Sequence, residues 1–522
     1  MMRHLIQSGK QITLGCLLCA CVFVFSACGN AGVPLKEEAN VIFPSVKVPY
    51  AAPIGDAALE YSRDYTLYLP RYDGAHLLAM SATVPCSAAR LDEESVIRAL
   101  LANEGNGVAS AIGGGVELSL YGANPVEVSG DVATVNLAAS ALQLDRKTLY
   151  LCSQAIANTL TELNGIRYVN VLVMDKQIGL DLGSTLPMGT LTRSVATDVG
   201  AVYEQLLSQR VNTDEKPKER RLSTTVTLYF PLTATDGIMA EARNVSFTSQ
   251  DPSDMVARIL EELSDGPEAV TGSPTLPLLA GLLSQPPKVT EPTDGSGKLI
   301  SLYFDSSMDD QLKNNNVSRA SCLGAISYSL CTFLPNVAGI TVYIGGELVE
   351  HVMLGAASGI LFTDGVEHRT DYASLLMADG TLFFPEAQGK GLVKVSRPMP
   401  CYLRTNPRSL LLELFRGPVA TDSRKDTKPV LSPGTLTDAD ILGLSLNDRT
   451  LAVNFSPAFA RAGETVTSGQ DRLLAYALTN TLLYSGQASR ICFFVGGNEP
   501  AGFSGEIDWT GYFYQNNGMV EK

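Results

Sequence analysis

The sequence predicts an α+β fold made of tandem repeated α/β sandwich domains, each with two helices packed on one face of a small mixed β-sheet. Three observations predict it. The 522 residues are too many for one hydrophobic core, because single cores stop growing at about 250 to 300 residues. The composition, with 45% hydrophobic and 18% charged residues, is typical of globular domains. Three similar pentapeptides, TLYLP, TLYFP and TLFFP, begin at Thr66, Thr227 and Thr381.

Each repeat is expected to open with a strand that ends at a proline. The pentapeptides place these prolines at Pro70, Pro231 and Pro385. Proline closes a strand because it has no N–H to donate to the ladder. The pattern leaves open whether a second strand follows.

An amphipathic helix is expected next in each repeat. Its apolar residues recur at offsets 0, 1, 4 and 5, which places four side chains on one helical stripe. The stripes are Val96, Ile97, Leu100 and Leu101; Met255, Val256, Ile259 and Leu260; and Leu410, Leu411, Leu414 and Phe415. These stripes are expected to face the core.

The ends of these helices are predicted from residue type. Residues that cap helix N-termini stand four positions before each stripe, at Asp92, Asp251 and Asn406. Glycine adopts the left-handed conformation that ends many helices. The helices are expected to stop near Gly105, Gly266 and Gly417.

Two strands, a longer helix and a closing strand are expected to complete each repeat. The strands alternate with period two, as in Ala133, Val135 and Leu137 of the first repeat. The closing strands are YVNVLVM, GITVYIG and ICFFVGG. A parallel doubly wound sheet is disfavoured, because helices do not alternate with every strand.

These elements divide the chain into predicted segments. They are a signal peptide (1–27), a tether (28–60), a first domain (61–184), a linker with a helix (185–222), a second domain (223–354), a looser linker (355–378), a third domain (379–515) and a tail (516–522).

The N-terminus is predicted to be a secretory signal. Basic residues precede an apolar run of about 15 residues, which is shorter than the roughly 20 that span a bilayer. The string FSAC then resembles a bacterial lipobox, so Cys28 is the predicted lipidation site. TLGC at Cys16 and LCAC at Cys21 are less complete competitors, and plain secretion with Cys28 as an ordinary thiol is the alternative. Two acyl chains would hold the protein durably on the extracytoplasmic face of the cell membrane.

Charge and residue usage argue against several function classes. The net charge of −15 disfavours nucleic acid as a partner. The cysteines beyond Cys28 lack metal-ligand spacing, and only His76, His351 and His368 follow the signal. GAASG lacks the serine position of a nucleophile elbow. We therefore expect no enzyme activity, with no catalytic residue, no cofactor and no metal site.

The aromatic residues after the last strand are candidate partner contacts. They are Trp509, the only tryptophan, with Tyr512 and Tyr514. Exposed aromatic side chains often anchor protein partners. The alternative is that these side chains pack back onto the third domain.

The repeats resemble the GerMN domain of GerM-type sporulation and spore-germination lipoproteins. The resemblance is carried by TLYFP, VARILEELSDGP, LLLELFRGP, LSPGT, GDVATVNLAAS, NDRTLAVNFSPAF and ANTLTELNGIRYVNVLV. It covers roughly three quarters of the chain, and its specificity comes from the order and threefold recurrence of these strings. The first repeat departs from it with EGN in place of Gly-Pro, and the second with the insertion SQPPKVTEPTDGSG.

The resemblance implies a noncatalytic envelope lipoprotein that acts as a scaffold or assembly factor in sporulation or spore germination. Its expected partners are the membrane, through the lipid anchor, and envelope or sporulation-complex proteins, with peptidoglycan as a further candidate. The alternative function is a ligand-binding module for peptidoglycan fragments or a small polar solute. A pocket between repeats would favour that alternative.

Overall fold

The structure is a computed structural model of the chain, and it describes residues 48–522 apart from short gaps. The gaps are residues 58, 184, 197, 211–215, 234, 271, 294, 356–357, 466–469, 501, 504–506 and 522. The described residues belong to one compact unit, Lys47–Lys522. The predicted signal peptide and Cys28 lie outside the described residues. Among the described helices, none combines the length and apolar character needed to cross a bilayer.

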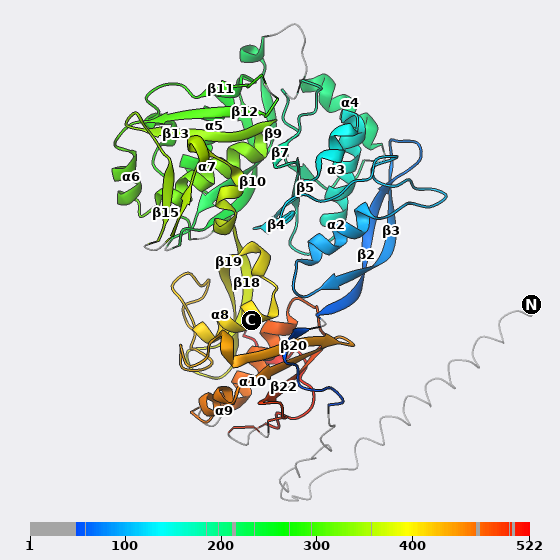
Figure 1. Cartoon of the computed structure of the whole chain (residues 1–522), viewed down its shortest axis with the longest axis vertical. Helices are drawn as coiled ribbons and strands as arrows, with labels where there is room; N and C mark the ends of the chain where they lie inside the picture. The colour runs from blue at the N-terminus through cyan, green and yellow to red at the C-terminus, as the bar shows by residue number, and fades with distance from the viewer. Residues whose placement is uncertain are drawn as a thin grey trace, which may run out of the picture. The chain divides into compact units, whose positions relative to one another are not determined.

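One order of elements recurs three times along the chain (Figure 1). The first repeat contains β2 (Glu60–Pro70), β3 (Leu77–Ser87), α2 (Asp92–Leu101), β4 (Val126–Ser129), β5 (Val132–Leu137), α3 (Arg146–Leu160) and β6 (Tyr168–Val173). The second contains β9 (Leu222–Pro231), β10 (Ile238–Phe247), α5 (Pro252–Asp265), β11 (Lys288–Thr290), β12 (Lys298–Phe304), α7 (Arg319–Phe333) and β13 (Val337–Ile344). The third contains β18 (Met377–Pro385), β19 (Leu392–Pro400), α8 (Pro407–Arg416), β20 (Ile441–Asn447), β21 (Thr450–Phe455), α10 (Gln470–Leu483) and β22 (Arg490–Val495). A second strand thus follows each opening strand, and the predicted α+β repeat fold is confirmed.

Each repeat has two sheets with a helix between them. The first two strands form an antiparallel hairpin, β2–β3, β9–β10 or β18–β19. The next three strands form a mixed sheet: β4–β5 is antiparallel and β5–β6 parallel, and the other repeats follow the same scheme. The second helix, α3, α7 or α10, contacts both sheets. Residues 149–160 of α3 are all buried, because apolar layers lie on both sides where the sequence predicted a single inward stripe.

A hydroxyl group of the second helix binds the opening strand at the same place in every repeat. The backbone N–H of the third pentapeptide residue donates to it: Tyr68 to Thr159 Oγ1 (2.9 Å), Tyr229 to Ser329 Oγ (3.0 Å) and Phe383 to Thr481 Oγ1 (3.0 Å). In an antiparallel pair, the N–H groups of alternate residues point away from the partner strand. The hydroxyl therefore satisfies a buried N–H that the hairpin leaves unpaired.

The predicted helix ends are confirmed in the second and third repeats. Asp251 accepts a hydrogen bond from the Ser253 N–H at 3.0 Å, and Asn406 caps α8 in the same way. Gly266 and Gly417, with φ of 81° and 77°, directly follow the last helical residues.

The predicted cap of the first repeat is wrong. Asp92 is the first residue of α2, and Leu91 stands at the cap position without a side-chain hydrogen bond. The Asp92 carboxylate instead accepts hydrogen bonds from the Tyr61 and Tyr65 hydroxyls on β2, which draw it away from the helix N–H groups. The helix also ends at Leu101, before the predicted Gly105.

The described parts of the connecting segments are packed against the repeats. The predicted linking helix is α4 (Val199–Arg210), whose Tyr203 ring lies 5.5 Å from the Tyr150 ring of α3. The segment predicted as a looser linker contains a 3₁₀ helix, Arg369–Leu375, that buries Tyr372 in the core of the second repeat. The remaining short elements are β7 (Lys176–Gln177), β8 (Leu191–Thr192), α6 (Met308–Asn314), β14 (Glu347–Leu348), β15 (His351–Leu354), β16 (Ser358–Leu361), β17 (Val366–Glu367) and α9 (Pro457–Gly463).

The start of the described chain packs on the third repeat. β1 (Gly55–Ala57) pairs in parallel with the edge strand β20. Arg408 holds this strand, because its Nε and Nη2 donate to the two carboxylate oxygens of Asp56, each at 2.7 Å. The sheet of the third repeat therefore includes a strand from the segment predicted as a tether.

Candidate interaction surfaces

The mixed sheet of each repeat has an outer sheet face, on the side opposite the second helix. Side chains on this face alternate along each strand with those that enter the core. In the first repeat it includes Glu127 and Ser129 on β4, Thr134 on β5 and Asn170 on β6, each at most 9% exposed. Such burial of polar side chains is tolerated only where each has a hydrogen-bond partner.

The hairpin β9–β10 of the second repeat covers this face. Asn170 Nδ2 donates to Thr227 Oγ1 on β9 at 3.0 Å. Ser129 Oγ accepts a hydrogen bond from the Ala240 N–H on β10 at 2.9 Å and donates to the Met377 carbonyl at 2.6 Å. The first repeat is thus tied to the next two through polar groups on one sheet face.

A buried ion pair completes this interface. Arg369 Nη2 lies 2.5 Å from Glu127 Oε2, and its Nε donates to Thr332 Oγ1 at 3.0 Å. The guanidinium carbon lies 4.1 Å from the ring centre of Tyr328, whose hydroxyl donates to Glu127 at 3.3 Å. Burial alone lowers the pKa of Arg369, but the Glu127 charge holds that pKa well above its usual value. Arg369 therefore remains charged in the interior.

The outer sheet face of the third repeat is covered by the start of the described chain. Val48 packs on Ala452, Cys492 and Phe494. Asn454 Nδ2 donates to the Pro53 carbonyl at 2.9 Å. An extended segment therefore takes the place that a hairpin takes on the first repeat.

The outer sheet face of the second repeat is the most open of the three. Tyr303 on β12 and Tyr343 on β13 stack with ring centres 4.8 Å apart and planes 14° apart. Ser301 and Thr341 beside them share a hydrogen bond of 2.9 Å. All four are partly exposed, whereas the equivalent residues of the other two repeats are buried. Paired aromatic rings at the surface are typical of protein-binding sites.

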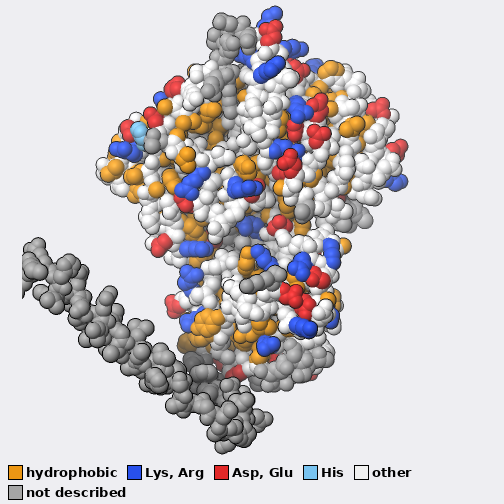
Figure 2. Space-filling view, turned by 180° about the vertical axis from the view of Figure 1, so that it is seen from behind, with side chains coloured by type: hydrophobic (Ala, Val, Ile, Leu, Met, Phe, Trp, Pro, Cys, Tyr) orange, Lys and Arg blue, Asp and Glu red, His pale blue; other side chains and the backbone are white. Residues whose placement is uncertain are grey.

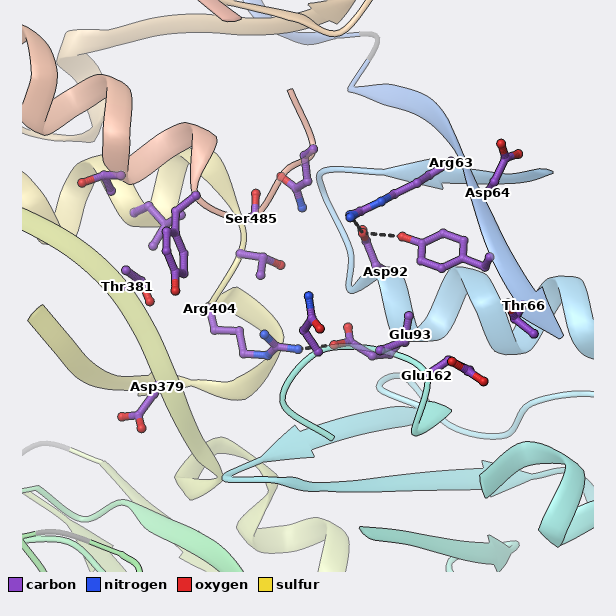
Figure 3. Close-up of a pocket in the computed structure, with 18 residues that line it drawn as sticks. Arg63, Asp64, Thr66, Asp92, Glu93, Glu162, Asp379, Thr381, Arg404 and Ser485 are labelled. Atoms are coloured by element: carbon purple, nitrogen blue, oxygen red, sulfur yellow. Dashed lines mark hydrogen bonds and ion pairs between the residues drawn. The ribbon is translucent and has the colours of Figure 1, made fainter. Parts of the chain in front are cut away.

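A cleft of about 490 Å³ lies between the first and third repeats (Figure 3). Corresponding parts of the two repeats form its walls. Asp64 and Thr66 on β2 match Asp379 and Thr381 on β18, because each pair stands at the same position relative to its pentapeptide. The residues that follow α3 and α10 line the cleft as well, with Ser485 among them. The cleft is therefore built from the same parts of two repeats.

Ion pairs and hydrogen bonds hold most of the charged side chains around the cleft. Arg404 of the third repeat is ion-paired with Glu93 of the first (Figure 3). Glu162 accepts a hydrogen bond from the Tyr68 hydroxyl at 2.7 Å, and this bond, with Arg193, lowers the pKa of Glu162.

The Tyr65 hydroxyl donates to Asp92 at 2.8 Å. Burial first, and then the Asp92 charge, raise the pKa of Tyr65. Tyr65 therefore stays protonated and keeps its hydrogen bond across the neutral range.

Three groups in the cleft lack a partner among the described residues. Arg404 Nε and Ser485 Oγ are buried atoms without a hydrogen bond. Asp379 is exposed, and in Figure 3 its carboxylate is directed away from Arg404 and no dashed line reaches it. The cleft thus offers two donors and a carboxylate to a ligand.

The remaining reactive side chains are buried or scattered. The six cysteines of the described chain are free and buried, and burial raises the pKa of Cys86 to about 11 and that of Cys152 to about 12. Such thiols are poor nucleophiles. Within the described ranges no cluster of His, Cys, Asp and Glu could hold a metal ion. On the face drawn in Figure 2, charged side chains of both signs are interspersed.

The predicted partner contacts are separated by the structure. Trp509 is fully buried in the third repeat, and its Nε1–H donates to Asp471 Oδ1 at 2.6 Å. Tyr512 is partly buried beneath Arg490, whose guanidinium carbon lies 4.2 Å from the ring centre. Tyr514 is 56% exposed. Only Tyr514 therefore keeps a largely exposed side chain, and the indole of Trp509 is a core group.

Sequence reasoning missed both the open sheet face and the cleft. The tyrosines at 303 and 343 alternate with core residues, which is the pattern of any half-buried strand. The cleft joins residues more than 300 positions apart, and only the recurrence of Asp-x-Thr at 64–66 and 379–381 signalled it.

A family model described as Germane, sporulation and spore germination, matches residues 66–179 and 381–500, in the first and third repeats. The tandem GerMN domains of the sporulation protein GerM from Bacillus subtilis are 16% identical, with 59% of this chain and 99% of that chain covered and a TM-score of 0.22. A putative lipoprotein from Clostridium perfringens is 15% identical, with 26% and 87% covered and a TM-score of 0.18. No curated protein matches. This family is described as a sporulation and spore-germination domain and not as a known enzyme class, and its model matches the first and third repeats of this chain.

Proposed function

We propose that the protein is a noncatalytic scaffold or assembly factor in sporulation or spore germination, anchored through lipid on Cys28 at the extracytoplasmic face of the cell membrane. The family match supports the process. The FSAC string supports the anchor. Its partners are envelope or sporulation-complex proteins, and nucleic acid is not among them.

The open outer sheet face of the second repeat carries the scaffold proposal. In the first and third repeats the same face is covered by another part of the chain, which is a hairpin in one case and an extended segment in the other. The second repeat presents the Tyr303–Tyr343 pair at that place instead. A partner protein is the occupant that we propose for it, because aromatic pairs of this kind supply much of the binding energy in protein interfaces.

Site-specific crosslinking in intact sporulating cells tests the proposal. A photo-crosslinking amino acid at position 303 or 343 is expected to capture an envelope protein. The matched control is position 72, where Tyr72 is 68% exposed on the turn after β2. Capture at 72 as strong as that at 303 and 343, or no capture at any of the three, contradicts the scaffold proposal.

The anchor has a separate test. Cys28→Ala is expected to move the protein from the membrane fraction to the soluble extracytoplasmic fraction, because two acyl chains hold a protein durably and no chain would remain. Cys16→Ala and Cys21→Ala serve as controls at the competing positions. Unchanged fractionation of Cys28→Ala, with loss in either control, would assign the lipid to another cysteine.

A second candidate function is ligand binding in the cleft between the first and third repeats. The unpaired Arg404 Nε and Ser485 Oγ favour it, since buried polar atoms are rarely left without partners. The volume of the cleft falls within the roughly 300 to 1,000 Å³ typical of ligand pockets. Calorimetric titration with purified peptidoglycan fragments tests it, and heat that disappears in Ser485→Ala is the expected result. Equal heat from Ser485→Ala and the unchanged protein would place the binding elsewhere.

A further inference from the structure

The two walls of the cleft include the free edges of β2 and β18. Among the described residues, each of these strands pairs on one side only, with β3 or β19. The Tyr68 N–H points away from β3, because it donates to Thr159. Since the direction alternates with every residue, the backbone groups of Thr66 and Asp64 also point away from β3. By the same alternation from Phe383, those of Thr381 and Asp379 point away from β19.

In the second repeat, the corresponding edge belongs to β9 and is occupied by a neighbouring segment of the chain. Thr225 stands two residues before its pentapeptide threonine, as Asp64 and Asp379 do in their repeats. Its carbonyl accepts a hydrogen bond from the Thr190 N–H at 2.9 Å, and Thr190 Oγ1 lies 2.9 Å from Thr227 Oγ1. A neighbouring stretch of backbone is therefore bonded to the outward edge of β9.

The corresponding edges of β2 and β18 open on the cleft. Within the described chain, no neighbouring segment forms a backbone hydrogen bond with the outward edge at Asp64, Thr66, Asp379 or Thr381. All four residues line the cleft. A strand edge with unpaired N–H and C=O groups is a template for an added strand, and extended peptides bind proteins in this way.

The charged side chains that line the cleft favour a cationic peptide over an acidic one. The lining contains five carboxylates, Asp64, Asp92, Glu93, Glu162 and Asp379, against two guanidinium groups, Arg63 and Arg404. Asp92, Glu93 and Glu162 are held by tyrosine or arginine partners. Asp379 is exposed and has no such partner. A cationic side chain complements this wall, while an acidic one is repelled.

We propose that the cleft binds an extended peptide segment with a cationic side chain, which pairs as an added strand with these free edges. Arg404 Nε and Ser485 Oγ supply donors to its carbonyl groups, and Asp379 receives the cation. The inference rests on the second candidate function, that the cleft binds a ligand, and is independent of the sheet face of the second repeat.

Fluorescence anisotropy with a labelled, capped octapeptide of alternating lysine and threonine tests the proposal. This lysine-threonine peptide is expected to bind the protein saturably. The same peptide with alternate backbone nitrogens methylated cannot complete a ladder, and a glutamate-threonine peptide reverses the charge. Each is expected to bind at least tenfold more weakly. Equal binding of the methylated peptide overturns the strand-addition proposal.

Two strand variants separate edge pairing from a general loss of the hairpin. Thr66→Pro removes an N–H that points into the cleft and is expected to weaken peptide binding at least tenfold. Ser81→Pro is the matched control, because Ser81 is paired with Thr66 and is exposed, and its N–H points to the opposite edge of the hairpin. Equal losses in the two variants would contradict the assignment of the β2 edge.

A charge variant tests the cation site without touching the backbone. Asp379→Asn is expected to weaken the lysine peptide several-fold and to reduce the salt dependence of binding. Glu261→Gln is the control, because Glu261 is an exposed carboxylate on α5 outside the cleft. No difference between the two variants overturns the role of Asp379.

A saccharide probe distinguishes this inference from the function on which it rests. If an N-acetylglucosamine trimer gives a heat of binding that is lost in Ser485→Ala and none of the peptides binds, the cleft is a ligand site but the peptide inference is wrong. If neither saccharide nor peptide binds, both proposals fall.

Discussion

The outer sheet faces of the first and second repeats occupy the same place in the same fold, and their surroundings are opposite. The first face buries Thr134 and Asn170 under a hairpin of the next repeat, while the second leaves Tyr303 and Tyr343 partly exposed. The third face is covered again, by residues from Val48 onward. The neighbour, and not the repeat itself, therefore decides whether an equivalent position is core or surface.

The two faces also differ in what holds them. The covered face of the first repeat depends on directional contacts, above all the Glu127–Arg369 pair. The open face of the second repeat has an aromatic pair, whose apolar contacts depend less on the exact orientation of the partner. Loss of a residue from the covered faces should therefore affect folding, and loss of one from the open face should affect binding.

The largest expected effect comes from the buried ion pair. Arg369→Ala leaves Glu127 as an uncompensated buried charge and is expected to lower the free energy of unfolding by about 3 to 5 kcal/mol, measured by chemical denaturation. Arg424→Ala is the control, because it removes an exposed pair with Asp426 and is expected to cost much less. Equal losses in the two variants would show that the Glu127 site is open to water.

A smaller effect is expected from equivalent aromatic residues on two faces. Phe494→Ala on the covered face of the third repeat should cost about 3 kcal/mol of unfolding free energy, because it leaves a cavity beside Val48. Tyr343→Ala at the same position of the second repeat should cost about 1 kcal/mol in the purified protein, since the ring is already partly exposed. A cost for Tyr343→Ala as large as that for Phe494→Ala would mean that the second face is covered too.

The pH dependence of stability should reveal a buried acid behind the open face. Burial raises the pKa of Glu367 to about 8 from 4.5, although the Tyr372 hydroxyl, which donates at 2.7 Å, opposes the shift. The folded protein therefore binds this proton more tightly than the unfolded chain. Its stabilising contribution is complete below pH 4.5 and is lost as the pH rises through about 8.

Glu367→Gln should remove this dependence, because glutamine stays neutral. Between pH 5 and pH 7 the unfolding free energy of the unchanged protein is expected to fall by about 2 to 3 kcal/mol relative to the variant. Denaturation curves at pH 5, 7 and 9 measure the difference. Parallel pH profiles for the two proteins would mean that Glu367 already ionises in its usual range.

The sequence predicted the repeat and its element order because both follow from local patterns. The stripe at Met255, Val256, Ile259 and Leu260 and the cap at Asp251 require only a few neighbouring residues. Asp92 misled the cap prediction because its partners, Tyr61 and Tyr65, lie about 30 residues earlier on another element. The preference of aspartate for cap positions does not show that its carboxylate accepts hydrogen bonds from another element instead.

The candidate sites depend on contacts between repeats, and no local pattern encodes these. Asn170 is a polar residue on a strand, which indicates an exposed position until Thr227 is placed against it. Trp509 shows the opposite case: aromatic residues in a tail left a partner contact and packing onto the third domain both open, and Asp471 receives the indole N–H within the core. Burial of an amphipathic side chain depends on where its polar atom finds a partner.

The smallest predicted effect concerns the cover of the third face. Asp56→Ala removes both hydrogen bonds from Arg408 and is expected to weaken the β1–β20 pairing by about 1 kcal/mol, because this pair is only partly buried. Amide hydrogen exchange should then become roughly fivefold faster at those N–H groups of the stretch Gly443 to Ser445 that point to β1, and not at those that point to β21. Asp426→Ala breaks an exposed pair with Arg424 outside this contact and should leave that exchange unchanged. If Asp56→Ala also leaves it unchanged, Val48 and Pro53 hold the segment without the ion pair, and the cover of the third face is as firm as that of the first.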